Sequence, residues 1–319
     1  MKYIIKTKNL SKKYGSLTAV NNVSLKVQKG KIYGFLGING AGKTTTIRLI
    51  LGMVKPTAGN CFLFGKDITN LSKKVWNEIG YLVENTHSYP ELTIRENLKI
   101  VYKLRNLKQK NAIDNIIEKL KLSRYQDFKV KNLSSGNIQR LGLAKALIHK
   151  PEILLLDEPT KGLDPAGIVE IRKLLKNLAE NNGTTIFISS HILSEISKLV
   201  NKIGIINQGK LIQEVDKSEL EKYKEKKLII NTNDNKKARQ ILKENKLYIK
   251  ENKEGYLVIK NNGALESPDK IAVQLVKQGC PPTLLKIEEE DLESYFLRLT
   301  GMENKGEMPY EQSKSSFVG

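Results

Sequence analysis

The stretch Gly37-Ile38-Asn39-Gly40-Ala41-Gly42-Lys43-Thr44 decides how the rest of this chain is interpreted. It fits the pattern G-x-x-x-x-G-K-[ST] at every fixed position. Residues 31–36 before it predict a strand, and residues 43–51 after it predict a helix that Gly52 closes. Glycines let the backbone curl so that successive N–H groups point inward, and the helix N-terminus adds the positive end of its dipole. The stretch therefore predicts a binding site for the phosphates of a nucleotide.

Individual roles follow from the same loop and from a second strand. Lys43 is predicted to reach the β- and γ-phosphates, Thr44 to bind Mg²⁺ through its hydroxyl, and Thr45 to touch the α-phosphate. The apolar run 153–156 predicts a buried strand, and it leads directly into two carboxylates, Asp157 and Glu158. We expect Asp157 to hold Mg²⁺, and Glu158 to orient or deprotonate an attacking water.

Hydrophobic periodicity divides the chain into regions of different character. Residues 1–220 alternate strands with helices, which predicts an α/β fold with a parallel sheet, and the pattern is helical from about 93 to 149. One strand is expected over 19–30. Residues 221–227 predict a charged linker or short helix, and the region 221–301 as a whole predicts a small α+β domain. Residues 302–319 show no periodicity and are expected to form a disordered tail.

Composition narrows the possible partners. The 319 residues carry a net charge of +20, and the excess sits in residues 1–220, which hold 36 basic and 18 acidic residues. Nucleic acid, an anionic membrane surface or a polyanionic ligand would all be attracted, and a general lysine bias explains the charge equally well. Aromatic residues make up only 6% of the chain, so no stacking platform for single-stranded nucleic acid is expected, and no specific nucleic acid is predicted.

Several other classes of protein are disfavoured by the same composition. No apolar run approaches the ~18 residues of a membrane span. The N-terminus lacks the apolar core of a secretory signal. Cys61 and Cys280 form neither a disulfide framework nor a ligand cluster. We therefore expect a soluble intracellular protein of two domains.

Residues 1–220 resemble the ATP-binding cassette (ABC) family, and the diagnostic motif is Leu133-Ser134-Ser135-Gly136-Asn137. The family motif reads Leu-Ser-Gly-Gly-Gln, so Ser135 and Asn137 depart from it and put the rate of hydrolysis in question. The resemblance implies a RecA-like P-loop core, with an antiparallel β part at the N-terminus and a helical subdomain at about 85–150. It also implies that Ser134 and Gly136 contact the γ-phosphate of an ATP held by a second cassette. Gly162-Leu163-Asp164-Pro165 matches the loop that touches this partner, and Asp164 is taken as part of the nucleotide site.

Three further residues receive roles from the resemblance. Tyr14 stands where an aromatic ring stacks on adenine, and His191 matches the histidine that contacts the γ-phosphate. Glu84 replaces a glutamine that touches Mg²⁺ and the attacking water, and a carboxylate there can still bind Mg²⁺. We expect Glu84 to be a functional substitution and a catalytic residue. His87 and His149 match nothing and are expected to be surface or packing residues.

Taken together, the resemblance implies an ATP- and Mg²⁺-dependent ATPase that dimerises, with a homodimer expected. It would power a separate membrane permease from the cytoplasmic face of the membrane. Glu84 and the stretch 294–301 are similar to cassettes of bacitracin export and lantibiotic self-protection, which implies export of an antimicrobial peptide. One alternative is a soluble cassette that acts on DNA or ribosomes. A P-loop kinase or GTPase is disfavoured, because those families have no counterpart of residues 133–140.

Overall fold

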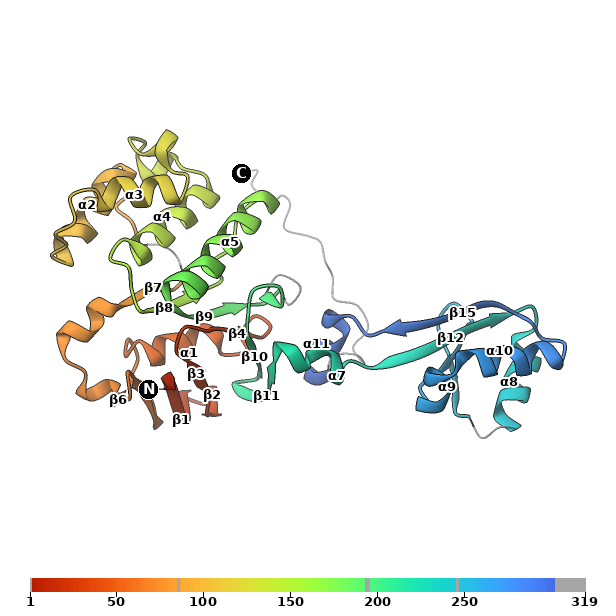
Figure 1. Cartoon of the computed structure of the whole chain (residues 1–319). Coiled ribbons are helices and arrows are strands. Elements are labelled where there is room, and N and C mark those ends of the chain that lie inside the picture. The colour runs from red at the N-terminus through yellow and green to blue at the C-terminus, as the bar shows by residue number, and fades with distance from the viewer. Residues whose placement is uncertain (1, 85–86, 193–195, 245–246, 302–319) are drawn as a thin grey trace, which may run out of the picture. The chain divides into compact units, whose positions relative to one another are not determined.

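The computed structural model describes residues 2–84, 87–192, 196–244 and 247–301. The chain divides into two compact units, Met1–Glu219 and Leu220–Gly319 (Figure 1). The predicted tail, 302–319, lies outside the described residues. Among the described helices, none is both long enough and apolar enough to cross a membrane.

A six-stranded sheet forms the centre of the first unit. Its strand order is β11-β10-β4-β9-β8-β7, and all neighbouring pairs are parallel except β10 with β11. Every residue of β4, β8 and β9 is buried, as their continuous apolar runs predict. This confirms the predicted parallel α/β core. The strands are β4 (Ile32–Leu36), β7 (Ile79–Leu82), β8 (Ile153–Asp157), β9 (Thr185–Ser190), β10 (Lys202–Asn207) and β11 (Lys210–Asp216).

A second, antiparallel sheet shares a buried apolar cluster with this core. Its strands are β1 (Tyr3–Tyr14), β2 (Leu17–Val23), β3 (Lys26–Gln28), β5 (Ala58–Leu63) and β6 (Lys66–Asp67). The prediction of a single strand over 19–30 is wrong, because β2 ends at Val23 and β3 begins at Lys26. At the break the buried Thr7 hydroxyl donates to the Val23 carbonyl at 2.9 Å and accepts from the Leu25 N–H at 3.0 Å. A side chain thus satisfies backbone groups that a continuous ladder would have paired.

In the part of the first unit that the structure describes, five α-helices accompany the sheets. They are α1 (Lys43–Ile50), α2 (Ile94–Leu104), α3 (Ala112–Lys119), α4 (Ser135–Leu147) and α5 (Pro165–Asn182). Helices α2, α3 and α4 contact one another, and α4 also contacts β7. Helix α2 begins at a capping box, in which Thr93 accepts from the Glu96 N–H and the Glu96 side chain accepts from the Thr93 N–H. The predicted helices therefore form where their caps and periodicity place them.

The second unit is a four-stranded antiparallel sheet of order β13-β14-β12-β15 with helices packed on it. Its buried core includes Leu228, Ile230, Leu242 and Leu275. Helix α9 was not predicted, since five residues are too short to show a period. Asn261 caps it by accepting from the Ala264 N–H at 3.2 Å. The elements are α7 (Leu220–Tyr223), β12 (Lys226–Thr232), α8 (Asn235–Glu244), β13 (Ile249–Glu251), β14 (Leu257–Ile259), α9 (Asn262–Glu266), α10 (Pro268–Lys277), β15 (Pro282–Glu289) and α11 (Leu292–Thr300).

Candidate active site

The glycine-rich loop connects β4 to α1 and is closely packed. Gly40 has φ +80° and Gly42 has φ +107°, a region that side chains disfavour. A Cβ on Gly42 would lie 2.4 Å from the Ala19 carbonyl oxygen, and one on Gly37 would lie 2.6 Å from that of Ile206. Gly42 caps α1 without any side-chain hydrogen bond to the helix. Helix N-termini whose first N–H groups have no side-chain cap are typical binding sites for anions.

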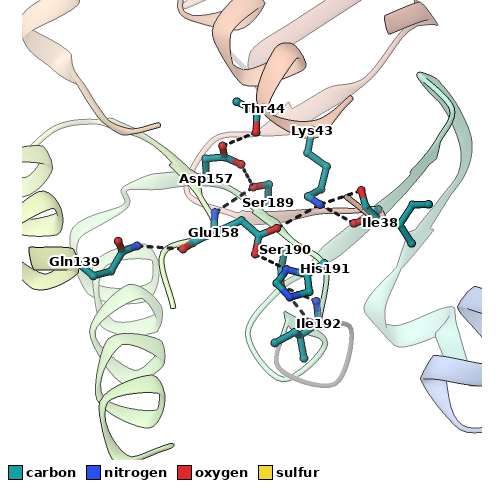
Figure 2. A network of polar contacts seen from close by, with 11 residues as sticks. Ile38, Lys43, Thr44, Gln139, Asp157, Glu158, Ser189, Ser190, His191 and Ile192 are labelled. Carbon is teal, nitrogen blue, oxygen red and sulfur yellow. Dashed lines mark hydrogen bonds and ion pairs between the residues drawn. The ribbon is translucent and has the colours of Figure 1, made fainter. Parts of the chain in front are cut away.

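Lys43 lies under this loop with only 6% of its surface exposed. Its Nζ donates to the carbonyl oxygens of Gly37 at 2.7 Å and Ile38 at 3.2 Å. The same nitrogen lies 3.2 Å from Glu158 Oε1. The loop backbone and a carboxylate together hold this ammonium group in place (Figure 2).

The two carboxylates follow the buried strand β8, and their surroundings differ. Asp157 is 5% exposed and has both oxygens occupied: Oδ2 accepts from Thr44 Oγ1 at 2.6 Å, and Oδ1 accepts from Ser189 Oγ at 2.5 Å. Glu158 leaves the strand with φ +50°. Its Oε1 faces Lys43, and its Oε2 lies 2.5 Å from His191 Nδ1 (Figure 2). The Glu158 carboxylate therefore lies between an ammonium group and an imidazole.

These groups face a cavity of about 1040 Å³. Tyr14 lines it with 46% of its surface exposed, and Lys12 Nζ lies 4.9 Å from the centroid of the Tyr14 ring. The predicted residues that the structure brings together here are Tyr14, Asn39, Gly40, Gly42, Lys43, Thr44, Thr45, Glu84, Asp157, Glu158 and His191. Ala41 is buried next to them in the loop.

Glu84 lines the cavity with its carboxylate engaged elsewhere. Its Oε2 lies 2.5 Å from Arg48 Nη2 on α1, and its backbone has φ +54°. The Arg48 contact was not predicted from the sequence.

The residues around 134–136 and Asp164 are placed differently. Ser134, Gly136 and Asp164 are not among the described residues that line the cavity. Ser134 caps α4, with its Oγ accepting from the Asn137 N–H at 3.3 Å, and Ser135 Oγ donates to the Gly162 carbonyl at 3.3 Å. Asp164 caps α5 by accepting from the Gly167 N–H at 3.0 Å. These residues therefore do not line the cavity of their own chain, and their contact with the nucleotide of a second cassette stays a prediction.

Two residues that contact Glu158 were missed by the sequence analysis. Ser189 contacts Asp157 and Glu158, and Gln139 Nε2 donates to the Glu158 carbonyl oxygen at 3.0 Å (Figure 2). The signal for Ser189 was its place at the end of a predicted buried strand. If that strand neighbours β8, a hydroxyl at its carboxyl end must lie near the carboxylates.

The other two histidines lie outside the cavity. His87 is exposed, whereas His149 is partly buried with its Nε2 3.2 Å from the Ile79 carbonyl oxygen. The pKa of His149 is lowered from 6.5 to about 4, with burial as the largest cause; the charge of Arg105 acts in the same direction, and the contact with Ile79 opposes both. At neutral pH His149 is therefore an uncharged packing residue.

The lowered pKa of His149 predicts that the protein loses stability in mild acid. Between pH 6.5 and 4 the unfolded chain binds a proton at this position and the folded chain does not, so the free energy of unfolding decreases as pH falls through this window. The full contribution is about 3 kcal/mol. Urea titrations at pH 7 and pH 5 should show a smaller decrease for His149→Gln than for the wild type. His87→Gln, at an exposed site, should behave as the wild type, and equal decreases in all three proteins would contradict the assignment.

Known proteins with similar sequences agree with this geometry. The family model described as "ABC transporter" matches residues 20–161. The bacitracin transport ATP-binding protein BcrA of Bacillus licheniformis is 43% identical over 304 residues, which cover 94% of this chain and 98% of that protein. The lantibiotic transport ATP-binding protein SrtF of Streptococcus pyogenes is 39% identical over 211 residues, which cover 66% of this chain and 90% of that protein.

A solved structure of an ATP-binding cassette is also similar to this chain. The dimeric post-hydrolysis state of the ATP-binding cassette MJ0796, bound to ADP and Pi, is 26% identical with a TM-score of 0.62. The match covers 67% of this chain and 98% of that one. With 43% identity to BcrA along nearly its whole length, the chain belongs to the ABC transporter family, as one of its ATP-binding proteins.

Proposed function

We propose that this ABC ATPase binds and hydrolyses ATP in the cavity of the phosphate loop and thereby powers export by a separate membrane permease. The observation that carries the proposal is the position of Glu158. Its carboxylate faces the cavity between Lys43 and His191, beside the N-terminus of α1, which has no side-chain cap. This combination supplies the positioning and the charge stabilisation on which phosphoryl transfer depends.

Nucleotide binding is assigned to the loop and its neighbours. The backbone N–H groups between Gly37 and Lys43 would hold the phosphates, with Lys43 on the β- and γ-phosphates and Thr45 at the α-phosphate. Tyr14, half exposed at the cavity wall, would stack on adenine.

The residues present also fit a magnesium ion. Thr44 Oγ1 and Asp157 Oδ2 lie 2.6 Å apart, and both are oxygen ligands of the kind Mg²⁺ prefers. In the described ranges, no cluster of three or more histidine, cysteine or acidic side chains could hold a metal by itself. This suits an ion held by one or two carboxylates together with phosphate. Glu84 would be a further ligand, in competition with Arg48. When bound, the ion would neutralise charge on the phosphates.

Hydrolysis then requires a base for the attacking water. We assign this role to Glu158, which would take the proton of the water as its oxygen bonds to the γ-phosphorus and the bond to the bridging oxygen breaks. Lys43 and His191 hold the carboxylate at both oxygens, and Gln139 holds its backbone. His191 would also contact the γ-phosphate.

The site is proposed to be completed by a second copy of the chain. Ser134 and Gly136 lie at the start of α4 and do not line the cavity of their own chain. In a homodimer arranged head to tail, they would contact the nucleotide of the partner, and the Asp164 loop would lie against it. The dimeric solved cassette supports this arrangement.

The permease is proposed to dock on a second hollow of the first unit. This hollow, of about 370 Å³, is lined by β7, α2 and α4 and exposes large apolar side chains. Leu104 is 80% exposed, Tyr89 59% and Tyr81 45%. Burial lowers the pKa of Lys145 on its wall to about 8. Because the protein is proposed to dock on a membrane permease, we place it at the cytoplasmic face of the membrane. The names of BcrA and SrtF support an antimicrobial peptide as the exported substrate.

Affinity purification from detergent-solubilised membranes tests the proposal. The wild type should carry along a polytopic membrane protein, and Leu104→Asp should lose it because a charge enters an apolar contact. Cells with the wild type should also tolerate bacitracin better than cells with Leu104→Asp.

The matched control is Val273→Asp, which introduces the same charge at a 52% exposed position of α10 in the second unit. It should retain the permease. Recovery of DNA or ribosomal proteins without any membrane protein would contradict the proposal and favour a soluble cassette.

A further inference from the structure

Ser189 lies near the carboxyl end of β9, the strand between the phosphate-loop strand β4 and the carboxylate strand β8. In register it stands opposite Phe35 on one side and Asp157 on the other. Its exposed fraction is 0%. A buried hydroxyl must satisfy its hydrogen bonds within the protein, so the partners of Ser189 are fixed by the fold.

The chemistry of those partners assigns every hydrogen in this contact. The Glu158 N–H can only donate, and Ser189 accepts it twice, with Oγ at 3.2 Å and with its carbonyl oxygen at 3.2 Å. The single hydroxyl hydrogen of Ser189 then goes to Asp157 Oδ1, 2.5 Å away. Asp157 Oδ2 is left for Thr44 Oγ1 at 2.6 Å. Both oxygens of Asp157 therefore have a defined direction, and the plane of the carboxylate is set by Ser189 on one side and Thr44 on the other (Figure 2).

We propose that Ser189 is a positioning residue that sets the Mg²⁺ affinity of the site. By holding Oδ1, it keeps Oδ2 of Asp157 directed toward Thr44. By accepting the Glu158 N–H, it helps to hold that residue in its left-handed conformation, φ +50°. Ser189 need not touch nucleotide or metal, since partners of a metal ligand act by orienting it. The inference rests on the proposed function, because it takes Asp157 and Thr44 as the metal ligands.

The test is an equilibrium measurement on the full chain with a fluorescent, non-hydrolysable ATP analogue. Affinity for the analogue is measured in EDTA, and Mg²⁺ is then titrated. In Ser189→Ala we expect unchanged affinity in EDTA and a Mg²⁺ midpoint raised about tenfold or more, the typical effect of losing the partner of a metal ligand. Ser189→Thr keeps the hydroxyl and should retain the wild-type midpoint.

Thr185→Val is the matched control, at the opposite end of the same strand. Thr185 is also 0% exposed, and its hydroxyl accepts from the Gly30 N–H at 2.9 Å, away from the carboxylates. It should lose stability but keep the Mg²⁺ midpoint. An unchanged midpoint in Ser189→Ala would overturn the inference alone. If the affinity of the wild type for the analogue were the same with and without Mg²⁺, the proposed metal site would be overturned and the inference with it.

Discussion

Lys43→Ala is expected to bind ATP about 100-fold more weakly than the wild type, or worse. The ammonium group lies 6% exposed below the phosphate loop, so its charge acts on the phosphates with little screening by water. Two charge-assisted hydrogen bonds to phosphate, at about 1.5–3 kcal/mol each, account for this factor. Calorimetric titration with ATP and Mg²⁺ measures it directly.

A second lysine of the same cavity provides the control. Lys161 lines the cavity, but its side chain is exposed, so Lys161→Ala removes the same charge at a screened position. It should bind ATP within a few-fold of the wild type. If Lys43→Ala also stayed within a few-fold, the phosphates would have to lie elsewhere than in this loop.

The parts of this site that lie close together in the sequence were predictable from it. The loop at residues 37–44 was predictable because all its fixed positions lie within eight residues, although the close approaches that require Gly37 and Gly42 are to Ile206 and Ala19. The buried strands β8 and β9 were equally visible, since a parallel sheet covered on both faces leaves continuous apolar runs.

The contacts that could not be predicted are those set by register across the sheet. Ser189 meets Asp157 because β8 and β9 are parallel neighbours in one particular register, and nothing in the intervening sequence encodes that pairing. The same is true of Arg48 with Glu84, which joins α1 to the end of β7. A second role of Asp164 was missed for a different reason. A residue before Pro165 is also a helix cap, and its side chain is used within the chain.

Glu158→Gln is expected to lower the rate of ATP hydrolysis by about 100-fold or more while ATP binding is retained. The amide keeps the shape of the side chain but cannot accept the proton of the attacking water, and a general base contributes about 100- to 10,000-fold. Bound ATP would then persist, and with it the dimer that encloses it. Light scattering after gel filtration, with and without saturating ATP and Mg²⁺, should show the mass doubling only with nucleotide.

Glu152→Gln is the appropriate control, because Glu152 precedes the same strand β8 at its opposite end and pairs with Lys29 at 2.6 Å. It loses one exposed ion pair, worth about 0–1 kcal/mol, and should hydrolyse ATP at the wild-type rate. The two readouts of Glu158→Gln test separate statements. Hydrolysis near the wild-type rate would remove Glu158 as the base. A variant that no longer hydrolyses ATP yet remains monomeric at saturating ATP would contradict the enclosing dimer, and with it the assignment of Ser134 and Gly136 to the nucleotide of the partner.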